Sequence, residues 1–166
     1  MDTHSITRWD LAVTVHGTPA GQGQVSFLGK GRPAIHSNQK KLLPWREAII
    51  TAVRAELART AGPARPAFVG EPMETDITIT VAKPKSAPKR RRTWPITRSS
   101  TDLDHHVRAV HDALSRAGAF GDDSQVVETK ARKVYPGEHP LALGEPGALI
   151  RVRVLPESLL GAEVAR

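Results

Sequence analysis

Hydrophobic and polar residues alternate in three segments of the chain, and each alternation predicts a β-strand. In a strand, successive side chains point to opposite faces, so every second position can be buried. The pattern is typical of strands that pack one face on a core and leave the other polar. The three segments are residues 9–16, 75–81 and 148–155.

Two other segments have the spacing of an amphipathic helix. We expect the first helix to open at Pro44, where the missing N–H of proline costs nothing, and to end at Gly62-Pro63. The second helix is expected from Leu103, because apolar residues recur at positions 103, 107, 110 and 114. Gly118 is a suitable residue to end it in the left-handed conformation.

Weaker patterns complete the expected fold. Residues 25–28 and 34–36 flank a glycine turn and predict a hairpin, and residues 125–135 predict a further strand. Two helices with about six strands favour an α+β (mixed α/β) fold with one mixed sheet. We expect a single domain over residues 9–156, a flexible N-terminus at 1–8 and a loosely held tail at 157–166.

Charge narrows the class of partner. Lys and Arg number 24 against 17 Asp and Glu, with a sequence pI of about 10.2. This balance favours nucleic acid or another anionic surface as the partner, and the alternative is a soluble protein whose surface is merely basic. The absence of cysteine excludes disulfides and thiolate metal sites. No apolar run is long enough for a signal peptide or membrane span, so we expect a cytoplasmic protein.

Residues 83–101 form a long polar segment without an acidic residue. A loop of this length within a compact domain is usually functional or disordered. We predict that its basic side chains contact DNA phosphates, and that Trp94 either stacks on an unpaired base or anchors the loop. The basic residues are Lys83, Lys85, Lys89, Arg90, Arg91, Arg92 and Arg98.

An acidic cluster follows at once, in TDLDHHVRAVHDALSRAGAFGDDSQV, residues 101–126. Asp102 or Asp104 could cap the helix, and Asp122 and Asp123 could belong to a turn. Alternatively, the chain returns beside the helix and brings carboxylates of both segments into one site. Such a site would suit Mg²⁺ or Mn²⁺, since hard cations take oxygen ligands.

Three further residues of the region support local predictions. His106 lies at the edge of the apolar stripe and is expected to be a partly buried histidine bonded to the backbone. Asp112 is expected to pair with Arg108, four residues before it on the helix. Lys133 falls among apolar positions of a predicted strand, which requires a partner that the sequence does not identify.

The same region resembles the RusA-type Holliday junction resolvases. That family shows D-x-D-N-L-x-K-x-x-x-D-A-L followed by D-D-x-Q-V; this chain has Asp102-Leu103-Asp104, Arg108, Asp112-Ala113-Leu114 and Asp122-Asp123-Ser124-Gln125-Val126. His105-His106 stand where the family has Asn-Leu, and Arg108 stands where it has lysine. A guanidinium keeps the charge of lysine but has a planar shape.

The resemblance implies a RusA-like fold and a small homodimeric endonuclease of DNA recombination and repair. Such enzymes bind four-way DNA junctions and make paired symmetric cuts with Mg²⁺ or Mn²⁺. By matched position, Asp102, Asp104 and Asp123 would be the catalytic metal ligands. Arg108 would be a catalytic cation at the scissile phosphate.

Two other functions are compatible with parts of the sequence. A basic DNA-binding protein without catalysis would use the acidic residues only for caps and ion pairs. A phosphoesterase of the DHH type would use the Asp104-His105-His106 triplet, but that family needs further Asp and His motifs over a longer chain. Dependence of cleavage on divalent metal separates an enzyme from a pure binder.

Overall fold

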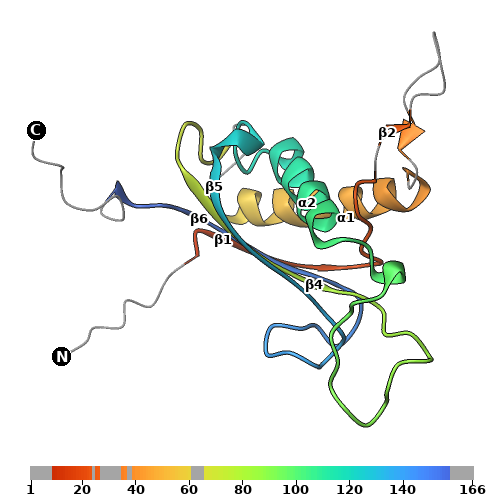
Figure 1. The fold of residues 1–166 in the computed structure, drawn as a ribbon. Coiled ribbons are helices and arrows are strands. Elements are labelled where there is room, and N and C mark those ends of the chain that lie inside the picture. The colour runs from red at the N-terminus through yellow and green to blue at the C-terminus, as the bar shows by residue number, and fades with distance from the viewer. Residues whose placement is uncertain (1–8, 24, 27–34, 37–38, 61–65, 158–166) are drawn as a thin grey trace, which may run out of the picture.

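The computed structural model describes residues 9–23, 25–26, 35–36, 39–60 and 66–157 (Figure 1). Its main sheet contains β1 (Leu11–His16), β4 (Met73–Thr80), β5 (Val126–Val134) and β6 (Gly147–Val154). The strand order is β1-β6-β4-β5, in which β6 is antiparallel to both neighbours and β5 is parallel to β4. The prediction of a mixed sheet in an α+β fold is confirmed.

The predicted hairpin is present as two short antiparallel strands, β2 (Val25–Ser26) and β3 (Ile35–His36). They form a separate sheet, and the predicted glycine turn lies outside the described residues. Gly62-Pro63, the predicted end of the first helix, also lies outside them.

Helix α1 (Gln39–Thr60) corrects the prediction that Pro44 opens it. The helix begins at Gln39, so Pro44 lies inside it and cannot donate a hydrogen bond to the Lys40 carbonyl. Leu42 and Trp45 on either side of the proline are buried in the core. Their packing outweighs the single missing bond, because tertiary burial supplies most of the stability of a helix.

Helix α2 (Leu103–Ala117) agrees with the prediction, including its end. Gly118 has the left-handed φ of 87°, and its N–H reaches the carbonyls of Leu114 and Ser115. Both helices cover the same face of the sheet (Figure 1). The core lies between these two layers and includes Leu11, Ile77 and Ile150 from three neighbouring strands.

The opposite face of the sheet carries ion pairs across β4, β5 and β6. Asp76 accepts hydrogen bonds from Arg132 at 2.6 Å and from Arg151 at 3.0 Å. Burial alone would raise the pKa of Asp76, but the two guanidinium groups outweigh it and lower the pKa. The network joins side chains of all three strands, and it therefore fixes β5, which leads from the acidic cluster, against the middle of the sheet.

Two loops leave the same end of the sheet, after the parallel strands β4 and β5 (Figure 1). Residues 81–97 form the basic loop, and a short 3-10 helix, η1 (Arg98–Ser100), connects it to α2. Residues 135–146 form the second loop and lead into β6. A second 3-10 helix, η2 (Asp123–Gln125), precedes β5.

Candidate active site

Two acidic side chains mark the start of α2. Asp102 occupies the N-cap position with an extended backbone, yet its side chain makes no capping hydrogen bond. Asp104 lies in the first helical turn with 70% of its side chain exposed. The ordinary explanation of Asp102 as a helix cap therefore does not hold.

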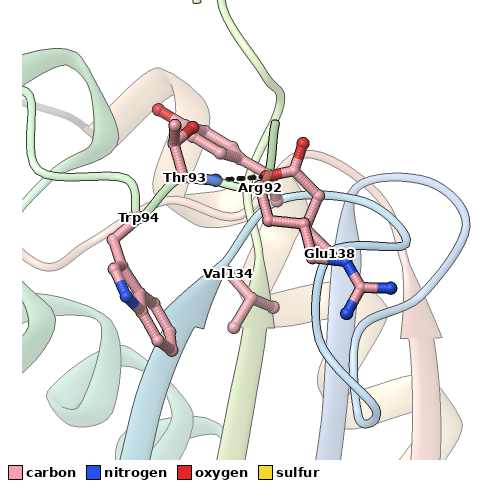
Figure 2. Close-up of a pocket in the computed structure, with 6 residues that line it drawn as sticks. Arg92, Thr93, Trp94, Val134 and Glu138 are labelled. Atoms are coloured by element: carbon pink, nitrogen blue, oxygen red, sulfur yellow. Dashed lines mark hydrogen bonds between the residues drawn. The ribbon is translucent and has the colours of Figure 1, made fainter. Parts of the chain in front are cut away.

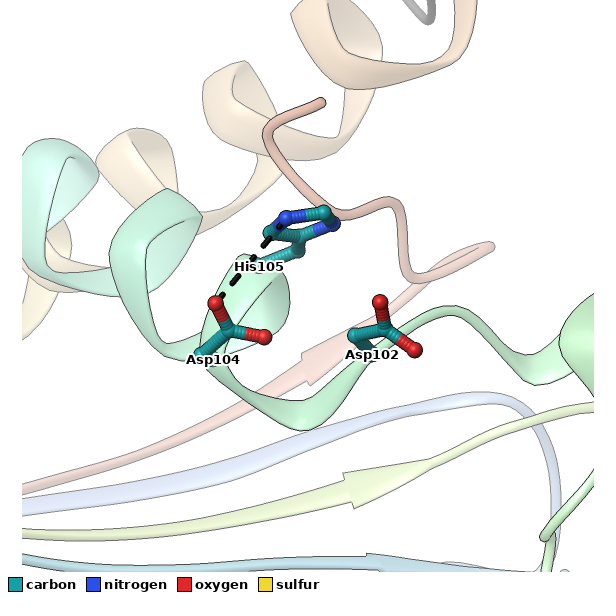
Figure 3. Close-up of side chains that lie close together, drawn as sticks. All are labelled: Asp102, Asp104 and His105. Carbon is teal, nitrogen blue, oxygen red and sulfur yellow. Dashed lines mark ion pairs between the residues drawn. The ribbon is translucent and has the colours of Figure 1, made fainter. Parts of the chain in front are cut away.

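His105 joins these two carboxylates. One ligand atom from each of Asp102, Asp104 and His105 lies within 4.8 Å of the others, and Figure 3 shows the three side chains together at the helix start. His105 Nε2 is 3.9 Å from Asp104 Oδ2. Neighbouring carboxylate and imidazole groups can share a cation. The signal in the sequence is the adjacency of Asp104 and His105, which by itself gives His105 no definite role.

The turn before this cluster is strained. Thr101 has a φ of 61°, the one positive φ of a non-glycine residue in the described part of the chain. A β-branched residue rarely adopts this conformation, and such strain persists only where the surroundings impose it. The strained residue lies directly before Asp102.

Two neighbours impose the strained conformation. Lys133 of β5 donates hydrogen bonds to Ser100 Oγ at 3.0 Å and to the Thr101 carbonyl, so this lysine has the partner that its apolar surroundings required. From the other side, Gly21 approaches so closely that a Cβ there would lie 2.4 Å from Thr101 Cγ2. The turn is held between β5 and the segment that follows β1.

His106 has a structural role, as predicted, and it is buried more completely than expected. Its Nε2 lies 2.9 Å from the Ser100 carbonyl oxygen. Burial lowers the pKa of His106, although the bond to Ser100 opposes that shift. The histidine packs beneath the turn and is separate from the exposed ligand cluster.

The two adjacent aspartates after α2 differ in role. Asp122 Oδ1 accepts a hydrogen bond from the Ser124 N–H at 2.9 Å and caps η2. Gln125 accepts a bond from the Gly121 N–H and donates to the Phe68 and Glu71 carbonyls, which fixes the turn against residues 68–71. Asp122 is thus a structural residue, while Asp123 remains exposed.

Asp123 and Asp104 line one groove between α2 and β5. The groove has a volume of about 580 Å³ and is also lined by Arg108, His111 and Ala131. Asp123 does not belong to the tighter set formed by Asp102, Asp104 and His105 among the described residues. The structure therefore brings Asp123 to the same groove as Asp104 but not into that set.

His111 is a polar residue of the groove that the sequence patterns did not single out. Its Nε2 lies 3.0 Å from Thr75 Oγ1. Burial lowers the pKa of His111, while the charges of Asp123 and Asp112 oppose this shift. Its position four residues after Val107, on the apolar face of α2, was the available signal.

Asp112 corrects a prediction. It pairs with Arg46 of α1, and the expected pair with Arg108 is not formed. Arg46 is buried between the two helices and also donates to Gln22 Oε1 at 2.6 Å. A buried guanidinium needs an anionic partner more than an exposed one does, so Asp112 joins the helices and Arg108 is left exposed on the groove.

The predicted DNA-contacting residues lie in the basic loop and at the start of η1, beside this site. Lys83 is only partly exposed and pairs with Glu138 of the second loop. The exposed members are Lys85, Lys89, Arg90, Arg91, Arg92 and Arg98. None of these six residues forms an ion pair with another described residue, so their charges are available to DNA phosphates.

Among the described residues, no helix has the length and apolar character needed to cross a membrane.

Comparison with known proteins gives the family. No curated protein matches the chain in sequence. The family described as Endodeoxyribonuclease RusA matches residues 17–143, a span that contains the ligand cluster, the groove and the basic loop. The chain therefore belongs to the RusA family of Holliday junction-resolving endodeoxyribonucleases.

Proposed function

We propose that this endonuclease cuts four-way DNA junctions in a reaction that depends on Mg²⁺ or Mn²⁺, by paired symmetric cuts from a homodimer, in DNA recombination and repair. The observation that carries the proposal is the cluster of Asp102, Asp104 and His105 at the rim of a groove that also contains Asp123. Membership of the family supplies the substrate, branched DNA.

The residues present fit a divalent cation. Two carboxylates supply the oxygen ligands that hard cations prefer, and His105 adds a nitrogen donor. The exposure of Asp104 leaves room for a phosphate to approach. When bound, the cation neutralises the carboxylates and polarises the scissile phosphate, which removes the repulsion between acidic side chains and DNA.

The remaining residues of the groove are assigned by position. Asp123 lies in the groove but outside the set of Asp102, Asp104 and His105, and we assign it as a further ligand from its match to the family motif. Arg108 contacts the phosphate and stabilises charge that develops on it. The hydrogen bonds from Lys133 fix the turn that directly precedes Asp102. The exposed cations of the basic loop bind the phosphates of the arms.

Two adjacent aspartates provide the test. Asp104→Asn and Asp123→Asn should abolish cleavage of a labelled four-way junction in Mg²⁺, while binding is retained or tightened because a negative charge near DNA is removed. Asp122→Asn is the matched control: an asparagine oxygen can still accept the Ser124 N–H, so cleavage should persist. Wild-type cleavage by the Asp104→Asn protein would refute the proposal.

The homodimer has its own test. Paired cuts in a junction of two-fold symmetry need two active sites, and a C₂ dimer supplies them. Light scattering should give about twice the chain mass of 18.0 kDa. A monomer that remains monomeric on DNA would contradict symmetric resolution by this protein.

A further inference from the structure

The basic loop exposes two large apolar side chains within residues 94–96, close to where the loop joins η1, and these three residues are called the apolar tip below. Trp94 is 63% exposed and Ile96 is 89% exposed, while Pro95 between them is buried. A single exposed apolar residue is ordinary. Here the buried Pro95 holds the backbone between two exposed apolar side chains, so both face solvent. Exposed Arg92 and Arg98 lie on either side of them in the sequence.

Hydrogen bonds from both sides hold this tip in place. Glu138 accepts a bond from the Thr93 N–H at 2.9 Å and pairs with Lys83, as Figure 2 shows in part. The hydrogen bond from Lys83 lowers the pKa of Glu138 and keeps the carboxylate charged. On the other side, Ser100 Oγ donates to the Pro95 carbonyl at 2.9 Å. Exposure of the two side chains therefore follows from an ordered backbone.

The surroundings of Trp94 suit a flat ring. The indole lies beside His139, with ring centroids 6.2 Å apart and planes inclined by 54°. The adjoining cavity has a volume of about 190 Å³ and is lined by Trp94, Val134 and Tyr135 among others (Figure 2). Small-molecule sites usually measure ~300–1,000 Å³, so this cavity is too small for a free nucleotide or cofactor.

We propose that Trp94 and Ile96 enter the branch point of a DNA junction, where Trp94 stacks on a base and Ile96 fills the gap between separated base pairs. The inference rests on the proposed junction-resolving function and names a determinant of its substrate specificity. Aromatic side chains stack on any base, and apolar side chains act as wedges between base steps. The flanking arginines match the phosphates that converge at a branch point.

The tip is connected rigidly to the ligand cluster. Ile96 and Asp102 are six residues apart, and η1 occupies most of the interval. Ser100 joins both regions, because it donates to Pro95 and accepts from Lys133. A base held at Trp94 thereby fixes the position of the phosphate that meets Asp102, and branch recognition is linked to the choice of bond.

The test compares a four-way junction that carries 2-aminopurine at the branch point with a linear duplex of the same sequence. Binding is measured by fluorescence in EDTA, so that no cleavage occurs. Trp94→Ala combined with Ile96→Ala should weaken junction binding about tenfold, the effect of removing one stacked base, and leave duplex binding nearly unchanged. The change in 2-aminopurine signal on binding should also disappear.

Two controls accompany the double variant. Trp94→Phe retains a stacking ring and should preserve most of the preference for the junction. Val69→Ala alters a side chain whose exposure, 64%, is close to that of Trp94 and which lies outside the basic loop, so it should change neither affinity. The exposure of both tip residues makes these variants compatible with folding, which circular dichroism checks.

The outcomes separate the two proposals. Equal weakening on junction and duplex, or an unchanged 2-aminopurine signal, would overturn the role of the tip. Loss of self-association in the double variant with junction preference intact would also overturn it and would assign the tip to protein contact. If wild-type protein binds junction and duplex alike, the proposed junction-resolving function fails first.

Discussion

Removal of the Asp112 carboxylate should destabilise the protein through a charge that it leaves behind. Only 5% of Arg46 is exposed, and its guanidinium lies between α1 and α2 with Asp112 and Gln22 as partners. Burial lowers the pKa of Arg46, whereas the Asp112 carboxylate favours the charged form. In Asp112→Ala, the buried cation loses its counter-ion.

The structure sets the size of the effect. Removal of one partner from a buried ion pair costs about 3–5 kcal/mol, because the other charge stays buried. The Asp112 side chain is 28% exposed, so water can replace part of the interaction. We therefore expect a decrease of about 2–3 kcal/mol in the free energy of unfolding, below the fully buried range.

Urea denaturation measures this decrease, and two comparisons isolate its cause. Glu56→Ala breaks a pair whose cation, Arg59 on the same helix, is 71% exposed, so no buried charge is left behind and the effect should be far smaller. Arg46→Met combined with Asp112→Leu replaces both charges with apolar groups and should recover most of the stability. High salt should weaken the exposed pair more than the buried one.

A double-mutant cycle decides whether the reasoning holds. If Asp112→Ala costs as much in an Arg46→Met background as in the wild type, the two residues are not coupled. The cost would then come from something other than the stranded charge, and the account of this helix contact would be refuted.

Three further predictions concern charge, protonation and strain. Alanine at Lys89, Arg90, Arg91 and Arg92 should weaken binding to junctions of any sequence alike and lower the magnitude of the salt slope by about 0.9 for each phosphate that the loop no longer binds; an unchanged slope would contradict it. Because the folded protein lowers the pKa of His111, the free energy of unfolding without metal should be highest above the unfolded pKa of about 6.5 and should decrease as the pH falls toward the folded pKa. His111→Gln should make this decrease smaller in urea denaturation over the same pH interval. Thr101→Gly should raise the free energy of unfolding by about 1 kcal/mol, because glycine adopts the positive φ without strain. A lower free energy of unfolding, measured by urea denaturation, would contradict the strain assigned to this turn.

Local patterns predicted the elements that depend on local forces. Alternation located β1, β4 and β6, and apolar spacing with Gly118 located α2 and its end. These signals arise within one element, because each reflects which face of that element is buried. Pro44 misled because the packing of Leu42 and Trp45 in the core outweighs a local rule.

Partners from other elements were the part that the sequence could not supply. The i,i+4 spacing pointed Asp112 to Arg108, but the buried Arg46 lies 66 residues away along the chain. Lys133 was recognised as unusual, yet its partners at Ser100 and Thr101 depend on how β5 lies under the start of α2. For the site, the motif pointed to Asp102 and Asp104, which lie close together in the structure, whereas the place of His105 beside them depended on the backbone at the start of α2.

The ties made by Gln125 have a consequence for how the enzyme is assembled during folding. Asp102 and Asp104 belong to one short segment, but the turn of Asp123 is fixed by bonds from Gln125 to the carbonyls of Phe68 and Glu71, and by β5 joining β4 in parallel. Parallel pairing requires a long crossover, here residues 81–125, which include the basic loop and α2. Such long-range contacts form late. A nascent or partly refolded chain can thus have its helices while Asp123 is still far from Asp102 and Asp104. With Asp123 as a metal ligand, as proposed above, the chain would acquire the capacity to cut DNA only as its sheet is completed.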